Sequence, residues 1–289
     1  LNKKSIINWT ILLILSMIWG SSFILMKKSL IKFNYIEVGF YRLIIAFILL
    51  SPFLYSAIRK VKKHHIIPLL IVSLIGTVLP AIIFAKSQMH IQSSLAGMLN
   101  SLTPIFTLIF GIIIFNKQLK FGNIVGIITG LVGTYLLLSP IKENLVYTKY
   151  SLMIIFATMC YAISINTIKD KLHSLEALDI AVISSMLSAI VPFTYLFNSG
   201  LLYNLEKIYL NLSHFYYLIV LGGICTSLAI ILFNYLIKRS SALFGSSTTY
   251  LIPVFAIIWG LLDSELISNQ ELISIGIILT GVYIMNKKN

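Results

Sequence analysis

Residues 93–111 read SSLAGMLNSLTPIFTLIFG, and residues 242–260 read ALFGSSTTYLIPVFAIIWG. The two stretches start 149 residues apart, and at that separation Pro104 meets Pro253 and Gly111 meets Gly260. Both are mostly apolar over about 20 residues, the length that an α-helix needs to cross a bilayer. The same separation aligns residues 66–111 with residues 215–260 without a gap. The chain therefore contains a repeated pair of predicted membrane helices.

Comparable apolar runs fill most of the remaining chain. Hydrophobic residues make up 58% of the sequence and charged residues 11%, against roughly 25% charged residues in soluble domains. A soluble fold could not bury this much apolar surface, whereas a lipid-exposed helical bundle does not need to. We expect an all-α membrane protein with ten spans, at residues 8–28, 36–57, 66–88, 94–116, 121–139, 150–168, 177–198, 213–237, 242–262 and 269–286. The longest loop is expected at residues 199–212.

The positive charges lie in short clusters between the apolar runs. The net charge of +13 does not form one basic face, so nucleic-acid binding is not indicated. With the N-terminus in the cytoplasm, 14 of the 22 Lys and Arg residues fall in cytoplasmic segments, in accordance with the positive-inside rule. We therefore expect both termini in the cytoplasm.

The repeat predicts how the two parts of the chain are oriented. Residues 1–141 and 142–289 each contain five expected spans, which is an odd number. The second half must then enter the membrane in the opposite direction to the first. Such inverted repeats allow a site between the halves to face either side of the membrane in turn.

Several short segments carry a family resemblance that covers nearly the whole chain. They are Trp19-Gly20-Ser21-Ser22-Phe23, Tyr41-Arg42-Leu43, Ser93 through Phe106, Gly126, Gly133, Ser246 through Pro253, Glu265, Gly276 and Gly281-Val282-Tyr283. The order and spacing of these segments resemble those of the drug/metabolite transporter superfamily, specifically of its EamA-type members with ten spans. That family usually has Gly-Glu after the fourth span. This chain has Asn116-Lys117 there and keeps an acid only in the second half, in Ser264-Glu265.

Two basic residues lie within the expected spans and are candidates for function, because charges at membrane depth are costly. Arg42 could reach the headgroups or could hold a substrate carboxylate or form part of an outer gate. Lys86 and its repeat partner Tyr235 would face equivalent surfaces, and both are predicted substrate contacts. Lys86 could likewise reach the headgroups or could bind a carboxylate in a cavity. We expect Lys86→Ala to impair carboxylate transport more than Arg42→Ala does.

Polar and aromatic positions paired by the repeat complete the predicted substrate-binding set. Asn100 and Thr249 are partners, each four residues before a matched proline, and Pro104 and Pro253 are expected to kink their spans and free a backbone carbonyl. A kink needed only for packing is the alternative. Trp19 and Tyr161 are also partners near mid-span, each followed three residues later by a serine. The remaining predicted contacts are Ser22, which follows Trp19, and Asn234.

The sequence gives little support for an enzyme active site, a metal site or a cofactor site. The five histidines are scattered, no HExxH motif or carboxylate pair appears at useful spacing, and Cys160 and Cys225 are expected to be buried structural thiols. We expect no metal and no cofactor. A membrane enzyme or a non-transporting assembly protein remains a less favoured alternative.

The resemblance implies a secondary carrier that works by alternating access in the bacterial cytoplasmic (inner) membrane. Its expected partners are the lipid bilayer and a small-molecule substrate, most simply an exported amino acid or related metabolite. A drug exporter or a lipid-linked sugar translocase of the same fold is the alternative that this resemblance leaves open.

Overall fold

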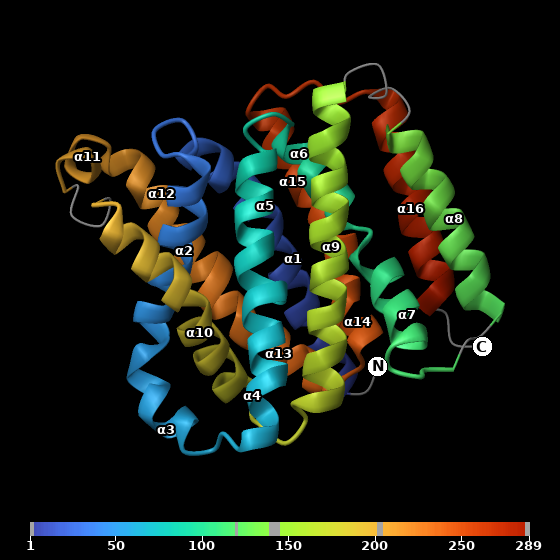
Figure 1. The fold of residues 1–289 in the computed structure, drawn as a ribbon. Helices are drawn as coiled ribbons and strands as arrows, with labels where there is room; N and C mark the ends of the chain where they lie inside the picture. Colours follow the sequence, from blue (N-terminus) through green and yellow to red (C-terminus); the bar gives the residue numbers. More distant parts are fainter. Residues whose placement is uncertain (1–2, 119–120, 139–144, 201–204, 287–289) are drawn as a thin grey trace.

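The computed structural model describes residues 3–118, 121–138, 145–200 and 205–286, and Figure 1 shows the bundle that they form. Within these ranges all regular structure is helical, in agreement with the predicted all-α class. The predicted boundary between the halves, at residues 141 and 142, lies outside the described ranges.

Eight helical segments of the described chain are long and apolar enough to cross a membrane, and each overlaps a predicted span. Five of them are built from successive helices. The segments are Ile6–Ser29 in α1 (Lys3–Ser29); Tyr35–Ile58 in α2 (Tyr35–Leu50), η1 (Ser51–Phe53) and α3 (Leu54–Ile58); Lys63–Ser87 in α4 (Lys63–Leu70), η2 (Ile71–Val78) and α5 (Leu79–Ser87); Ser93–Ile113 in α6 (Ser93–Asn100) and α7 (Thr103–Ile113); Leu145–Lys171, which is α9; Ala177–Asn198, which is α10; Leu212–Arg239 in α12 (Leu212–Gly222), η5 (Gly223–Leu228) and α13 (Ala229–Arg239); and Ala242–Leu262 in α14 (Ala242–Ser246), η6 (Ser247–Tyr250) and α15 (Ile252–Leu262).

Two further helices, α8 (Phe121–Leu138) and α16 (Asn269–Asn286), pack against each other at one edge of the bundle (Figure 1). Residues Phe121–Leu137 form a shorter apolar helix. Glycines bring the two helices close: a Cβ added to Gly281 would lie 2.6 Å from the Gly126 carbonyl oxygen and 2.6 Å from the Gly130 nitrogen. Small residues of this kind allow backbone-to-backbone contact between membrane helices.

The matched prolines lie at breaks within two spans. α6 ends at Asn100 and α7 begins at Thr103, with Pro104 in its first turn. Pro253 likewise lies in the first turn of α15, after the 3₁₀ turn η6. Proline suits the first turn of a helix because its missing N–H has no helical partner there. Each proline therefore starts a new helix, where the sequence suggested a kink inside a continuous one.

Wide π-helical turns occur at repeat-related places in the two halves. η2 and η5 each contain a threonine whose hydroxyl donates to the carbonyl five residues earlier: Thr77 to Val72 at 3.0 Å and Thr226 to Leu221 at 2.8 Å. These two hydrogen bonds are themselves 149 residues apart. π-helical turns are uncommon and are often found at functional sites.

The starts of α2 and α10 are also built alike. The Asn34 side chain accepts from the backbone of Ile36 and Glu37, and the Glu37 carboxylate accepts from the Asn34 N–H. Glu176 and Asp179, each 142 residues further on, form the same reciprocal cap before α10. Such capping boxes satisfy the N–H groups that a helix start leaves unpaired.

Ion pairs join each of these caps to the other part of the chain. Lys207 pairs with Glu37 at 2.7 Å, and Lys60 pairs with Asp179 at 3.1 Å. Lys207 belongs to α11 (Leu205–Leu210), a short helix inside the region 199–212 that was expected to be a loop. The two caps lie at opposite ends of the bundle, because α2 and α10 run in opposite directions (Figure 1).

Candidate substrate cavity

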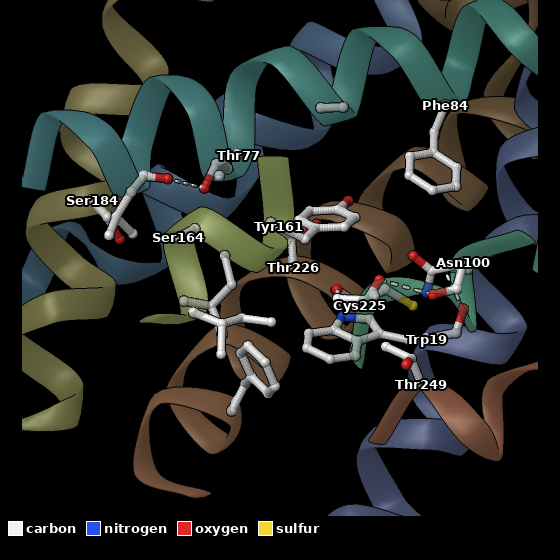
Figure 2. A pocket seen from close by; sticks show the side chains of 18 of the residues that line it. Trp19, Thr77, Phe84, Asn100, Tyr161, Ser164, Ser184, Cys225, Thr226 and Thr249 are labelled. Carbon is white, nitrogen blue, oxygen red and sulfur yellow. Dashed lines mark hydrogen bonds between the residues drawn. The ribbon is translucent and has the colours of Figure 1, made fainter. Parts of the chain in front are cut away.

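A cavity lies between the two halves of the described chain, and Figure 2 shows it from close by. The space open to the centre of a water molecule is about 130 Å³, against roughly 10–15 Å³ for a single water, so a small metabolite fits. The lining residues are Trp19, Ser22, Phe23, Met26, Arg42, Leu43, Val72, Gly76, Thr77, Ala81, Phe84, Asn100, Thr103, Tyr161, Ser164, Ile165, Ile168, Ser184, Cys225, Thr226, Ile230, Phe233, Asn234 and Thr249.

Positions related by the repeat line this cavity together. Every lining residue of α1 has its counterpart 142 residues later on α9, and every such counterpart lines the cavity too. The pairs are Trp19 with Tyr161, Ser22 with Ser164, Phe23 with Ile165 and Met26 with Ile168. At a separation of 149 residues the lining pairs are Gly76 with Cys225, Thr77 with Thr226, Ala81 with Ile230, Phe84 with Phe233, and Asn100 with Thr249.

Aromatic rings form much of the apolar wall. Trp19 packs edge-on against Phe233, with ring centroids 4.8 Å apart, and its indole N–H donates to the Cys225 carbonyl at 3.0 Å. Tyr161 stacks on Phe84 at 5.9 Å. Aromatic faces offer both apolar contact and attraction for a cationic group. The hydrogen bond from Trp19 fixes its ring at the wall, next to the π-helical turn η5.

Arg42 is held by this same turn. Its Nε and Nη2 donate to the Thr226 hydroxyl oxygen at 3.3 and 3.2 Å. The Thr226 hydroxyl in turn donates to the Leu221 carbonyl. The packing of α2 against η5 thus places a guanidinium group in the cavity wall, within the apolar segment Tyr35–Ile58.

Asn100 presents an unused acceptor. Its side chain is buried, and its Oδ1 has no hydrogen-bond partner. Its backbone carbonyl accepts from the Thr103 hydroxyl at 2.8 Å. The hydroxyl of its repeat partner, Thr249, donates to the Ser246 carbonyl at 2.8 Å, and Figure 2 shows Asn100 and Thr249 close to Trp19 at one end of the cavity.

Most of the predicted substrate-binding residues line this cavity. These are Trp19, Ser22, Asn100, Tyr161, Asn234 and Thr249. Arg42, which was predicted as an anchor or part of a gate, lines the cavity as well. Within this group, the Ser22 hydroxyl donates to the Trp19 carbonyl at 2.6 Å and the Asn234 amide to the Ala177 carbonyl at 3.4 Å.

Lys86 and Tyr235 do not line the cavity. The Lys86 ammonium lies 5.4 Å from the centre of the Tyr35 ring. The Tyr235 hydroxyl accepts from Arg239 at 2.7 Å, and the residue is 39% exposed. The expected order of importance, Lys86 above Arg42, is therefore not supported by their positions.

Three kinds of lining residue were not singled out in the sequence. In the sequence, Thr77 and Thr226 stand out only because they align with each other in the repeat. The π-helical turns that direct them into the cavity have no clear sequence signal. Phe84 and Phe233 were matched in the same way. Cys225 is buried as expected, but it also lines the cavity. Among the described residues no cluster of three or more His, Cys, Asp or Glu side chains could hold a metal ion.

Comparison with known proteins agrees with this architecture. The model of the EamA-like transporter family matches the chain twice, over residues 7–139 and 148–287. An uncharacterized transporter of Archaeoglobus fulgidus is 22% identical over 97% of this chain and 99% of its own length. The uncharacterized inner membrane transporter YedA of Escherichia coli K12 is 26% identical over 94% of this chain and 88% of its own. One crystal structure shares the fold, with a TM-score of 0.66 and 13% identity over 96% of this chain and 95% of that chain.

Proposed function

The chain belongs to the EamA-like transporter family, and from that premise we propose that it is a secondary carrier of small metabolites that works by alternating access. The observation that supports this most directly is the cavity whose lining positions pair between the two halves. A site built from equivalent residues of both halves can be exposed to either side when the halves exchange conformations. Ten spans, in halves 1–141 and 142–289, are part of the proposal.

The inverted relation of the halves is supported by the caps of α2 and α10. The cap at Asn34 and Glu37 and the cap at Glu176 and Asp179 are equivalent in sequence and geometry, yet they lie at opposite ends of the bundle (Figure 1). A repeat related by an axis in the membrane plane has this property.

The proposed location is a bacterial cytoplasmic membrane, with both termini in the cytoplasm. The α3–α4 connection and the end of α9 lie at one end of the bundle (Figure 1), and these segments carry the basic residues Arg59, Lys60 and Lys171. By the positive-inside rule this end faces the cytoplasm. A relative described as an inner membrane transporter supports the same location.

The proposed substrates are amino acids or related metabolites, moved outwards. A cavity of this size, with a guanidinium, amide and hydroxyl groups and aromatic rings, suits a small zwitterion or anion better than a lipid-linked sugar. Transport rather than catalysis is favoured by the family and by the names of its relatives.

Flux through the purified protein in proteoliposomes tests the proposal. We expect a labelled amino acid from a broad panel to exchange across the vesicle membrane, and Asn100→Ala and Thr249→Ala to slow it. Thr280→Ala is the matched control, since the Thr280 hydroxyl makes a similar bond to its own helix, to the Gly276 carbonyl at 2.8 Å, on the exposed face of α16. Folded protein with no flux for any compound would refute the carrier function.

A further inference from the structure

Arg42 stands out by its charge. Among the residues that the structure describes, it is the one charged side chain that lines the cavity. The described carboxylates all lie elsewhere, at Glu37, Asp170, Glu176, Asp179, Glu206, Asp263, Glu265 and Glu271. The guanidinium thus has no counter-ion in the cavity wall.

A charged side chain inside a membrane has a high free-energy cost unless a group of opposite charge lies beside it. A guanidinium has five N–H donors, and Thr226 accepts from two of its nitrogens. These bonds are to a neutral hydroxyl, which orients the group but does not neutralise it. The planar guanidinium matches the two oxygens of a carboxylate, so a carboxylate is the ligand group that best fits the remaining donors.

Repeat-related residues of both halves line the cavity, but the charged lining residue, Arg42, comes from the first half alone. At the separation that relates α1 to α9, Arg42 corresponds to Ser184, which also lines the cavity but carries no charge. The unpartnered Oδ1 of Asn100 is a second unsatisfied polar group, and a buried acceptor without a donor is costly. A molecule with an anionic group and an N–H donor would satisfy both.

We propose that Arg42 is the residue that determines substrate charge: it binds the carboxylate of the transported molecule, while the Asn100 Oδ1 accepts a hydrogen bond from a donor on the same molecule. This inference rests on the proposed carrier function. Thr226 is the positioning residue, because its hydroxyl holds the guanidinium at η5. The aromatic wall formed by Trp19 and Tyr161 covers the apolar part of the molecule.

Binding of three probes with the same phenyl ring to the purified full chain tests the inference. 3-Phenylpropionate carries the carboxylate, 3-phenylpropionamide replaces it with a neutral group of the same shape, and L-phenylalanine adds an ammonium group. We expect the carboxylate to bind at least about tenfold more tightly than the amide, the range for a hydrogen bond to a charged group. Calorimetry measures both affinities.

The variants separate charge from shape. Arg42→Gln should remove the preference for the carboxylate, Arg42→Lys should keep part of it, and Thr226→Val should weaken it. Lys86→Gln, which removes a cation outside the cavity, is the matched control and should keep the preference. Asn100→Leu should remove any gain of L-phenylalanine over 3-phenylpropionate. Size-exclusion chromatography of each variant verifies that it is folded.

Three outcomes would overturn the inference. They are no binding of either carboxylate probe at millimolar concentration, equal binding of acid and amide to the unaltered protein, and a preference that survives in folded Arg42→Gln. Flux measured in parallel distinguishes a failure of this inference from a failure of the carrier proposal. If Arg42→Gln still transports and still prefers the carboxylate, the carrier function is kept and the role of Arg42 is refuted. Absence of all flux would remove the carrier instead.

Discussion

Glu265 accepts hydrogen bonds from both the backbone N–H and the hydroxyl of Ser93, at 3.0 and 2.7 Å. Ser93 begins α6, and Glu265 follows the end of α15. The same carboxylate accepts from the Ser94 N–H at 3.0 Å and pairs with Lys27 at 2.8 Å. One carboxylate therefore joins three spans, α1, α6 and α15, at the end of the bundle opposite to the α3–α4 connection (Figure 1).

Glu265→Gln should destabilise the protein. The amide keeps the shape but loses the charge that pairs with Lys27 and that favours the N-terminus of α6. Loss of a partner for buried donors costs about 1–3 kcal/mol. Thermal unfolding in detergent measures the change. Glu271→Gln is the control, because Glu271 caps α16 through Ser268 on the exposed surface and should cost much less; equal losses would contradict the role given to Glu265.

The Glu265 carboxylate also predicts an acid-dependent loss of stability. Burial alone would raise its pKa, but hydrogen bonds from Lys27, Ser94 and Ser93 outweigh burial and lower the pKa from 4.5 to about 2. A pKa that is lower in the folded than in the unfolded chain gives stability that is complete above pH 4.5 and is lost as the pH falls towards 2. Unfolding temperatures across this range should fall less steeply for Glu265→Gln than for the unaltered protein.

Ser264, which precedes Glu265, adopts a left-handed backbone conformation with φ 61°. Its counterpart Asn116 has φ 50°, and the next N–H closes the helix end in both halves, from Lys117 to Gly111 and from Glu265 to Gly260. Glycine adopts this backbone conformation without the steric cost of a side chain. Ser264→Gly should leave stability unchanged or raise it, whereas Ser264→Val should lower it by about 1 kcal/mol or more. Ser199→Val, at φ −81°, is the control for thermal unfolding.

Gly281→Ala should destabilise the contact between α8 and α16. The added methyl group would meet backbone atoms of Gly126 and Gly130, which cannot rotate away, and overpacking of this kind costs about 1–3 kcal/mol. Gly276→Ala, on the same helix, meets nothing within 4 Å and should be tolerated. Thermal unfolding of the two variants would contradict this packing if they lost stability equally.

Arg42→Ala should reduce flux of carboxylate substrates more than Lys86→Ala does. Arg42 lines the cavity, while Lys86 lies against Tyr35. Initial rates in proteoliposomes with matched protein content measure the effect. A larger loss for Lys86→Ala would restore the order suggested by the sequence and would contradict the importance of the cavity position.

The membrane-crossing helices could be predicted from the sequence because bilayer thickness imposes a minimum length on each apolar run. The repeat added the pairs Trp19 with Tyr161 and Asn100 with Thr249, which meet in one cavity. Spacing alone cannot show how a helix is rotated, so the sequence did not distinguish Arg42, which lines the cavity, from Lys86, which lies outside it. The contact between Arg42 and Thr226 joins residues 184 positions apart and depends on the packing of α2 against a π-helical turn.

The breaks at the prolines were foreseen as kinks for a similar reason. Proline indicates that a hydrogen bond is missing, but not whether the helix bends or ends. The structure ends α6 at Asn100 and restarts the helix at Thr103. The hydroxyl of Thr103 then donates to the Asn100 carbonyl, which the helix break leaves without a helical N–H partner. The residue types permit this contact but do not require it.

The two ion pairs at the caps of α2 and α10 have a mechanical consequence. Lys207 with Glu37 and Lys60 with Asp179 connect the halves at both ends of the bundle, along the line where α2 and α10 pack together. Because an ion pair holds the α2–α10 contact at each end, this contact could serve as a hinge axis. The halves could then turn about it without separating there. In the proposed carrier cycle, the halves would separate away from this axis, where Glu265 joins α15 to α6. We then expect the hydrogen bonds that stabilise this end of the fold to break when it opens.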